Sequence, residues 1–583
     1  MVWSPLVLAG GVIAVLSATP AGGTAEAVET PPPLSKRTIE SGLPLSANQQ
    51  ATGLDVLDLD LRIDPAAASI EARARYTLTA LAAMTRVEFD LDPRYAIAGV
   101  WLDGASLPAT AWRNEDGQLS IDLPATAAKG DRLSVEIRYS GRPHIAERAP
   151  WNGGIMWRLT PAGQPWIATA NQMEGCDILW PCIDSPVKRV ATTNIAFTVP
   201  APLVAAGNGT FVGRSDENGW TTWRWRARNL NIYGLTLNIG PYEKVEKIYT
   251  SRFGNSFPIS FWHLPGHGTE AAALVEQLAD AIAFFERTIG PYPFGDEKAG
   301  IVETPHLGME HQTINGYGNG FKLSPEGYDW LMQHEFAHEW FANQLAQTET
   351  KHMWLQEGLG SYMQPLYMQQ ARGEQLYQAL MWDMRKRIVS KVALVPEEFL
   401  TSTYYNDEDA GWGRDIYTKG AWIAHTLRGL IGDRAFFDAL RATVYGRPDP
   451  LPGNFAPVYR TTDDFRRAAE AASGRDLKWF FDAYLHQGPL PKLEVRRNGR
   501  QLALAWTTAA GTPFPMPVEV RVGARTVRVD MSGNKGSLAL GPDPGDYTVD
   551  PANKILRDDP AITAWQGQEK AARDAAAKVA APR

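Results

Sequence analysis

Two kinds of hydrophobic periodicity divide the chain into three regions. Between residues 47 and 245 apolar and polar residues alternate, and Asp-Gly and Asn-Gly pairs separate the alternating runs. This pattern predicts antiparallel sheet. Between residues 246 and 489 apolar residues recur at helical spacing, and short alternating runs return over residues 490–558. The chain is therefore expected to be a multidomain α+β protein: an N-terminal antiparallel β domain, a mostly helical domain and a small C-terminal β-sandwich-like domain.

The helical region contains eight predicted helices. The first helix ends at Gly290-Pro291, a pair that stops helices. The other helices also have an apolar face and a polar face. The predicted ranges are 269–289, 326–347, 353–372, 374–394, 418–431, 434–445, 462–472 and 476–486. Residues 559–583, rich in Ala, Lys and Glu, are expected to form a helical or disordered tail.

The N-terminus resembles a secretory signal. Residues 2–16 are apolar, and small residues follow up to Ala25-Glu26-Ala27, as in an h-region and its cleavage site. No Lys or Arg precedes the apolar run, which leaves open whether it is cleaved or kept as an anchor. We expect residues 1–27 to be a signal peptide that exports the chain to the periplasm or beyond the cell. Residues 28–46, Pro-rich and polar, are expected to form a flexible linker.

Composition excludes several classes of protein. The 583 residues carry 57 basic and 65 acidic side chains, a net charge of −8 with no long basic run, which argues against nucleic-acid binding. After the N-terminal segment no stretch approaches the ~20 apolar residues of a membrane span, so none is expected in the mature chain. Two cysteines exclude a disulfide framework and a Cys-rich zinc module. Cys176 and Cys182 either pair in an oxidising compartment or stay reduced, and the sequence leaves both open.

A possible catalytic centre lies on the second predicted helix. Residues His334-Glu335-Phe336-Ala337-His338 form an H-E-x-x-H motif. Because residues four apart lie on one helical face, both imidazoles can reach one metal ion. Glu335 then lies beside the metal, where it can take a proton from water. The alternative is a chance match between histidines that are only packed or solvated.

A third ligand is expected just downstream. Catalytic zinc usually has three protein ligands and one open position. Glu357 follows His338 by 19 positions and lies at the start of the next predicted helix, so an antiparallel neighbour could return it to the metal. Without the upstream motif, an acidic residue in a first helical turn would be read as an interaction with the helix dipole.

Together these motifs resemble the zinc aminopeptidases of the M1 family, within the gluzincin group. The matching pattern is an H-E-x-x-H motif followed, after eighteen residues, by a Glu within a W-L-x-E-G segment. The chain is similar to the shorter bacterial members, which do not have the large helical C-terminal domain. Three further segments are similar: His306-Leu-Gly-Met-Glu310-His-Gln to G-x-M-E-N, Tyr417-Thr-Lys-Gly-Ala421 to Y-x-K-G-A, and Gln172-Met-Glu174 with Pro181-Cys-Ile-Asp-Ser-Pro186 to Q-x-E…P-C-x-D-x-P. The chain departs from the family at Leu307 and His311, which replace a Gly and an Asn and affect the first side-chain pocket.

The resemblance implies a thermolysin-like catalytic domain that holds one Zn²⁺ per chain through His334, His338 and Glu357. It implies that Glu335 moves the proton of the attacking water and that Tyr417 steadies the tetrahedral intermediate. Glu310 would hold the α-ammonium of the substrate, because a buried carboxylate without a partner is costly and blocked chains would be rejected. The remaining predicted substrate-binding residues are Gly308, Met309, Gln172 and Glu174. For Gln172 and Glu174 a purely structural bond to loop backbone is the alternative.

The expected function is an exported, zinc-dependent aminopeptidase that removes N-terminal residues from peptides with a free N-terminus by metal-activated water attack. Two alternatives remain. Some members of the family also open a lipid epoxide at the same metal, which would make the chain a bifunctional aminopeptidase and epoxide hydrolase. The second alternative is a non-catalytic peptide-binding protein of the same fold. The presence of both Glu335 and Tyr417 argues against this alternative.

Overall fold

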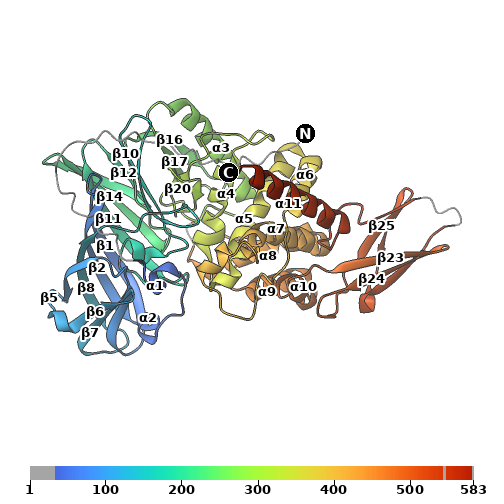
Figure 1. Cartoon of the computed structure of the whole chain (residues 1–583), viewed down its shortest axis with the longest axis horizontal. Coiled ribbons are helices and arrows are strands. Elements are labelled where there is room, and N and C mark those ends of the chain that lie inside the picture. Colours follow the sequence, from blue (N-terminus) through green and yellow to red (C-terminus); the bar gives the residue numbers. More distant parts are fainter. Residues whose placement is uncertain (1–32, 453–454, 542–545, 581–583) are drawn as a thin grey trace. The chain divides into compact units, whose positions relative to one another are not determined.

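The computed structural model describes residues 33–452, 455–541 and 546–580. The predicted signal peptide, residues 1–27, lies outside the described residues. From Leu34 onward the chain forms one compact unit. The α+β organisation predicted from the sequence is confirmed, with strands first, helices next and strands again (Figure 1).

The N-terminal region consists of three sheets. Its largest sheet has the order β13-β14-β11-β1-β2-β8-β4-β5, in which only β1 and β11 pair in parallel. Alternate residues of β1, including Leu57, Leu59 and Leu61, are buried, as the alternating sequence requires. Tight turns at Asp103-Gly104 and Asn218-Gly219 have positive φ at both residues, which Asn, Asp and Gly tolerate. The smaller sheets are β3-β7-β6 and β12-β15-β10-β9.

The strands of this region are β1 (Thr52–Asp64), β2 (Ser69–Ala80), β3 (Met84–Asp90), β4 (Ala96–Leu102), β5 (Ala105–Ser106), β6 (Trp112–Glu115), β7 (Gln118–Ala127), β8 (Arg132–Gly141), β9 (Gly154–Leu159), β10 (Pro165–Ala170), β11 (Arg189–Pro200), β12 (Val204–Ala206), β13 (Thr210–Glu217), β14 (Trp220–Asn231) and β15 (Asn238–Gly240). Two 3₁₀ turns accompany them, η1 (Ala109–Ala111) and η2 (Cys176–Ile178).

The segment before β1 corrects one expectation. Residues 34–46 were expected to belong to a flexible linker, but helix α1 (Lys36–Ile39) forms there and α2 (Ala47–Ala51) follows directly. Ser35 caps α1 by accepting the Thr38 N–H, and the Arg37 guanidinium donates to Asp90 at 2.6 Å. The cap and the ion pair tie this segment to the β domain, which a Pro-rich, polar composition does not reveal.

The helical region is built on a five-stranded sheet with the order β16-β17-β18-β20-β19. Its strands are β16 (Glu243–Thr250), β17 (Ser256–His263), β18 (Ala299–Glu303), β19 (Gly308–Met309) and β20 (Asn315–Tyr317), so the predicted boundary at residue 245 falls inside β16. The helices are α3 (Gly268–Thr288), α4 (Trp330–Ala337), α5 (Trp354–Arg372), α6 (Glu374–Arg385), α7 (Trp412–Ile431), α8 (Asp433–Tyr445), α9 (Thr462–Ser473) and α10 (Lys478–Leu485). Shorter elements are η3 (Glu339–Gln344), β21 (Leu345–Gln347), η4 (Thr350–His352), η5 (Ser402–Asn406) and β22 (Val458–Arg460).

Helix α4 is much shorter than the predicted range 326–347. It begins after Asp329, whose carboxylate accepts the Met332 N–H, and the chain turns into the wider coil η3 after His338. The Glu339 carboxylate explains this turn, because it accepts hydrogen bonds from the Thr313 N–H and the Asn315 amide. These contacts hold the chain away from the axis of α4, so the helix ends directly after the H-E-x-x-H motif.

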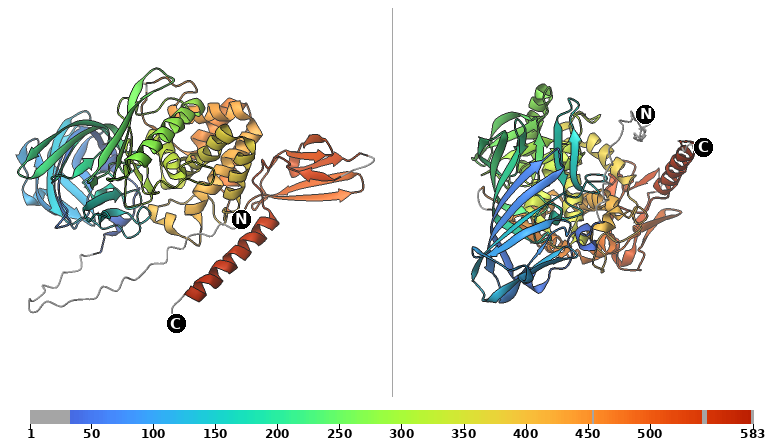
Figure 2. Two further views of the ribbon diagram at one scale, coloured as in Figure 1. Left: turned by 90° about the horizontal axis from the view of Figure 1, so that it is seen from above. Right: turned by 60° about the vertical axis from the view of Figure 1, so that its left-hand side comes forward.

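The C-terminal strands form two three-stranded sheets, β23-β24-β27 and β26-β25-β28, followed by helix α11 (Figure 2). Phe514 packs against Trp479 and Tyr484 of α10, so the strands share a core with the helices.

None of the described helices has the length and hydropathy that crossing a bilayer requires. The bounds are β23 (Lys492–Asn498), β24 (Gln501–Thr507), β25 (Val518–Val522), β26 (Arg525–Val529), η6 (Ser532–Asn534), β27 (Lys535–Ala539), β28 (Tyr547–Val549) and α11 (Pro560–Ala580).

Helices α5 and α7 cross at a pair of glycines. A Cβ placed on Gly358 would lie 2.8 Å from the Gly420 Cα, and one on Gly420 would lie 2.8 Å from the Gly358 Cα. Both distances are shorter than van der Waals contact, so only glycine allows the two backbones to come this close. Gly358 directly follows Glu357, and Gly420 lies three residues after Tyr417. The crossing therefore sets the distance between two predicted site residues.

We predict that Gly358→Ala destabilises the protein by about 1–3 kcal/mol, the usual effect of overpacking. The new methyl group would meet backbone atoms of α7, which cannot rotate away. Denaturant unfolding of the purified variant measures this change. Gly567→Ala on α11 is the matched control, because its Cβ would meet no atom within 4 Å and Ala favours helix. Equal stability of the two variants would contradict the close crossing.

Candidate active site

A cleft of about 530 Å³ contains most of the residues that the sequence selected. Its walls come from α4, α5, α7, η5, strand β19 and two loops of the N-terminal region. The predicted site residues that line it are Gln172, Gly308, Met309, Glu310, His334, Glu335, His338, Glu357 and Tyr417. Glu174 is the predicted site residue that does not line the cleft.

Three predicted metal ligands converge in this cleft. The Nε2 atoms of His334 and His338 lie 3.3 Å apart, and the Glu357 Oε2 lies 3.7 Å and 3.3 Å from them. All three side chains are buried, and their ligand atoms lie within 4.8 Å of one another. The Glu357 Oε2 is enclosed and accepts no hydrogen bond from any residue that the structure describes. Two imidazole nitrogens and one carboxylate oxygen are a donor set that suits Zn²⁺.

The secondary structure orients these ligands. His334 lies in the last turn of α4 and His338 caps the helix, so their rings project from one face. The Nδ1 of His338 lies 3.1 Å from the Phe341 carbonyl in η3, and a protonated Nδ1 leaves Nε2 free to bind a metal. Glu357 is in the first turn of α5, which packs against α4. The early end of α4 thus supplies both the second histidine and the carbonyl that orients it.

Glu335 lies on the opposite side of a narrow gap from strand β19. A Cβ on Gly308 would be 2.2 Å from the Glu335 Oε1, so glycine at this position makes room for the carboxylate. Burial raises the pKa of Glu335 well above its ordinary value, and the nearby Glu310 charge adds to the effect. A carboxyl group with a raised pKa at this position is suited to accepting and returning a proton.

Three hydrogen-bond donors surround one oxygen of the Glu310 carboxylate. Its Oε1 accepts hydrogen bonds from Gln172 Nε2 at 2.6 Å, Gln356 Nε2 at 2.7 Å and the Tyr233 hydroxyl at 3.0 Å. All three donors are neutral, and Glu310 takes part in none of the ion pairs that the structure describes. Burial raises the pKa of Glu310 to about 7. The carboxylate is therefore held in place while its charge stays unpaired.

Gln172 and Glu174 have separate roles in the structure. Gln172 contacts Glu310 in the cleft, whereas the Glu174 Oε2 accepts the N–H of Gly153 at 2.7 Å. Burial raises the pKa of Glu174 to about 7. The prediction that Glu174 binds substrate is not supported by this placement, because the backbone bond turns it out of the cleft lining. Next to it, Cys176 and Cys182 form a disulfide, which answers the question that their spacing left open.

Tyr417 projects from α7 toward the ligand set. Its ring lies 5.8 Å from that of His334, and its hydroxyl oxygen lies 2.9 Å from that of Tyr405. Burial raises the pKa of Tyr417 well above its ordinary value, and the Glu357 charge raises it further. The phenol thus stays protonated at neutral pH and can donate to a developing negative charge.

His311, which replaces the Asn of the family motif, lies elsewhere. It is fully buried, and its ring packs edge-on against that of His306 at 6.2 Å without lining the cleft. It is therefore not one of the ligand atoms that converge in the cleft. His311 also does not form a wall of the cleft, so its effect on the first side-chain pocket is at most indirect.

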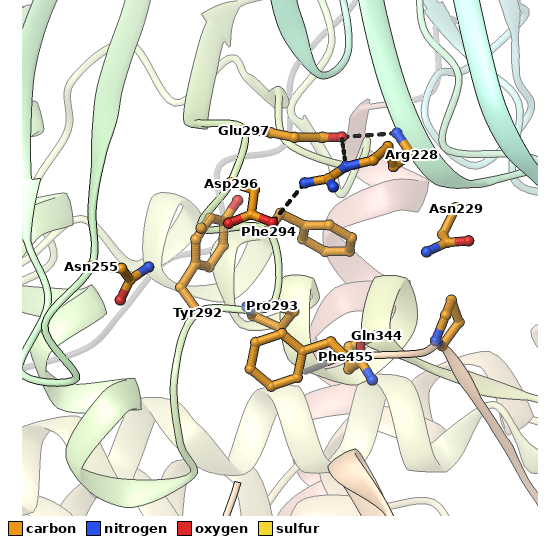
Figure 3. A pocket seen from close by; sticks show the side chains of 12 residues that line it. Arg228, Asn229, Asn255, Tyr292, Pro293, Phe294, Asp296, Glu297, Gln344 and Phe455 are labelled. Carbon is orange, nitrogen blue, oxygen red and sulfur yellow. Dashed lines mark hydrogen bonds and ion pairs between the residues drawn. The ribbon is translucent and has the colours of Figure 1, made fainter. Parts of the chain in front are cut away.

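A second cavity, of about 130 Å³, is shown in Figure 3. Its walls include Arg228, Tyr292, Phe294 and Phe455. The Arg228 guanidinium pairs with Asp296 at 2.8 Å and approaches Glu297 at 3.9 Å, so one cation faces two acidic groups there. This cavity brings together none of the predicted site residues.

Two residues that donate hydrogen bonds to Glu310, Gln356 and Tyr233, were not predicted from the sequence. Gln356 stands directly before Glu357 inside the W-L-Q-E-G motif, and its place there could have suggested a role. Tyr233 comes from the N-terminal region, in a loop after β14 without any motif. Its contact with Gln356 joins residues 123 positions apart, and no local pattern encodes it.

Comparison with known proteins gives the class of the chain. Residues 326–484 match the model of the "Peptidase family M1 domain". The fold is similar to that of an M1 zinc metallopeptidase from Deinococcus radiodurans, with a TM-score of 0.64, 21% identity and coverage of 78% of this chain and 97% of the other. A variant of that protein bound to a Tyr-Ser-Ala substrate gives a TM-score of 0.62 at 21% identity, with coverage of 78% and 98%.

Curated relatives agree with this class. Leucine aminopeptidase 2 of Vanderwaltozyma polyspora is 24% identical over 55% of this chain and 48% of its own length. Aminopeptidase N of Streptomyces lividans is 26% identical over 51% of this chain and 37% of its own length. The chain thus spans about half or less of these two relatives. The resemblance inferred from the motifs is confirmed: residues 326–484 match the M1 peptidase domain, and the fold is similar to that of M1 metallopeptidases.

We predict that the purified chain binds one Zn²⁺ and that Glu357→Ala lowers the bound metal to well under half an equivalent. Losing one of three ligands leaves a weak site of two imidazoles. Elemental analysis after dialysis against a mild chelator measures the metal content. The control is His267→Ala, which alters a half-exposed histidine paired with Glu303. Full zinc retention by Glu357→Ala would contradict the ligand set.

Proposed function

We propose that the chain is an exported, zinc-dependent aminopeptidase that hydrolyses the N-terminal residue from peptides with a free N-terminus. The observation that carries this proposal is the arrangement of Glu310. Three neutral donors hold its Oε1, and the carboxylate forms no ion pair with any residue in the described part of the chain. An α-ammonium is the group that complements such a charge in a cleft that also holds three metal ligands.

The residues of the chain divide the reaction among them. When bound to His334, His338 and Glu357, zinc supplies a Lewis acid that activates water and polarises a carbonyl. Glu335 takes the proton of the attacking water and delivers it to the leaving nitrogen. Tyr417 donates its hydrogen bond to the oxygen that becomes negative. Glu310 binds the substrate ammonium, which places the first peptide bond, and not a later one, beside Glu335.

The relatives support this reading through their names, Leucine aminopeptidase 2 and Aminopeptidase N. A leukotriene A-4 hydrolase homolog of Botryotinia fuckeliana, 23% identical over 69% of this chain and 63% of its own length, supports the bifunctional alternative. The contacts around Glu310 favour the peptidase, since a lipid epoxide offers no ammonium to the carboxylate. A non-catalytic peptide binder would have no use for Glu335 beside the ligand set.

We predict that the chain releases the anilide from aminoacyl anilides but not from their N-acetylated forms. Glu310→Gln should lower kcat/KM for the free-amine substrates about 10²-fold, as expected when a buried charge pair loses one partner. Glu335→Gln should keep zinc and fold but lose all but about 1% of kcat. Initial rates with and without a chelator, together with zinc content, measure these effects. Equal cleavage of blocked and free substrates would remove the role given to Glu310.

Export is the second part of the proposal. The Cys176–Cys182 disulfide supports it, because such bonds persist in oxidising compartments and are rare in the cytosol. We predict that the full chain, expressed in a bacterium, is recovered outside the cytoplasm with both cysteines unreactive to maleimide. Cell fractionation and mass spectrometry under non-reducing conditions measure this. A cytoplasmic pool with two reactive thiols would contradict export.

A further inference from the structure

Tyr405 is a cleft residue to which neither the motifs nor the proposed function assigns a role. It lies on η5, and its hydroxyl oxygen is 2.9 Å from that of Tyr417. The two rings meet edge to face at 6.4 Å with an interplanar angle of 76°. The hydroxyl that is expected to steady the reacting oxygen thus has a second tyrosine as its immediate neighbour.

The direction of this hydrogen bond follows from the count of protons. A tyrosine hydroxyl has one proton to donate and two lone pairs that can accept. Under the proposed function, Tyr417 gives its one proton to the oxygen of the scissile carbonyl, so it has none left for Tyr405. Either hydroxyl can be the donor across the 2.9 Å contact, and in this reacting arrangement the donor is Tyr405.

The position of Tyr405 is fixed by contacts to the N-terminal region. The Ser402 hydroxyl donates to the Met173 carbonyl at 2.5 Å and accepts the Ser41 N–H at 2.9 Å. The Asn406 amide donates to the Trp151 carbonyl at 3.3 Å. Both ends of η5 are thereby attached to loops beside the predicted amine site.

Gly413 brings the start of α7 against the same turn. A Cβ on Gly413 would lie 2.2 Å from the Tyr405 carbonyl oxygen, so glycine is needed for this approach. Helix α7 carries Tyr417 one turn later. The relative placement of the two tyrosines is therefore set by a close backbone contact as well as by their hydroxyl groups.

We propose that Tyr405 is a positioning residue that donates to the Tyr417 hydroxyl and keeps the Tyr417 proton directed at the oxygen of the scissile carbonyl. The proposal rests on the peptidase function and acts through Tyr417 alone. Without the Tyr405 proton, the Tyr417 hydroxyl is free to rotate and is a weaker donor. Because a net hydrogen bond of this kind is modest, the expected loss is about 3- to 10-fold in kcat.

A double-mutant cycle tests this proposal. Tyr405→Phe should lower kcat about 3- to 10-fold with KM unchanged, and Tyr417→Phe should lower it about 10²–10³-fold. The double variant should equal Tyr417→Phe, because Tyr405 has nothing left to position. Tyr404→Phe is the matched control: it removes a hydroxyl from the same turn, where the ring packs on Trp412 outside the cleft lining. Thermal unfolding of all four variants separates kinetic effects from loss of fold.

Two results would overturn the proposal while leaving the peptidase function intact. One is an active wild type in which Tyr405→Phe behaves like Tyr404→Phe. The other is a double variant with the product of the two single effects, which would mean that Tyr405 contacts the substrate itself. Failure of the proposed function looks different, because wild type would then be inactive on every free-amine substrate.

A binding measurement makes the proposal testable without turnover. An aminophosphinic dipeptide carries a tetrahedral, negatively charged oxygen in place of the scissile carbonyl. Calorimetry should show its affinity falling about 3- to 10-fold in Tyr405→Phe and no further in the double variant than in Tyr417→Phe. Unchanged affinity in Tyr405→Phe would contradict the donor role.

Discussion

The convergence of three buried ligand atoms from α4 and α5 is the constraint on which the rest of the cleft depends. Two imidazole nitrogens and a carboxylate oxygen share one small space, and none of the described residues donates a hydrogen bond to the Glu357 Oε2. Leaving such a group buried is costly unless a cation completes it. Helix α4 ends after His338 and α5 crosses α7 at Gly358, and both features serve to bring these atoms, and Tyr417 with them, to one point.

The cleft also contains two carboxyl groups, those of Glu335 and Glu310, which have different surroundings. Glu335 and Glu310 are both buried, burial raises the pKa of both carboxyl groups, and the Glu310 charge raises that of Glu335 further. Their neighbours differ: Glu335 lies against the backbone of Gly308, whereas Glu310 is fixed through one oxygen by three neutral donors. Under the proposed function, Glu335 serves proton transfer and Glu310 holds a cation. That division would limit hydrolysis to the ends of peptide chains.

The sequence predicted those site residues whose positions follow from helical spacing or from a short motif. His334, Glu335 and His338 are set by helical spacing, and Glu357 and Tyr417 by motifs whose glycines govern the α5–α7 crossing. Tyr233, Gln356 and Tyr405 were not predicted, because their contacts join distant segments whose packing no short pattern encodes. For Glu174 the structure shows the alternative that the sequence left open, because its carboxylate accepts the backbone N–H of Gly153. In the fold, the order of strands and helices was predicted, whereas the end of α4 depended on Glu339 bonding to Thr313.

A crystal structure of the zinc-loaded chain with an aminophosphinic dipeptide, recorded across the zinc absorption edge, tests the central claim most directly. The account predicts one anomalous peak at about 2.0–2.2 Å from the His334 and His338 Nε2 atoms and a Glu357 oxygen, with the ligand amine against Glu310. A peak bound by other residues, or a ligand amine that points away from Glu310 toward solvent, would contradict it.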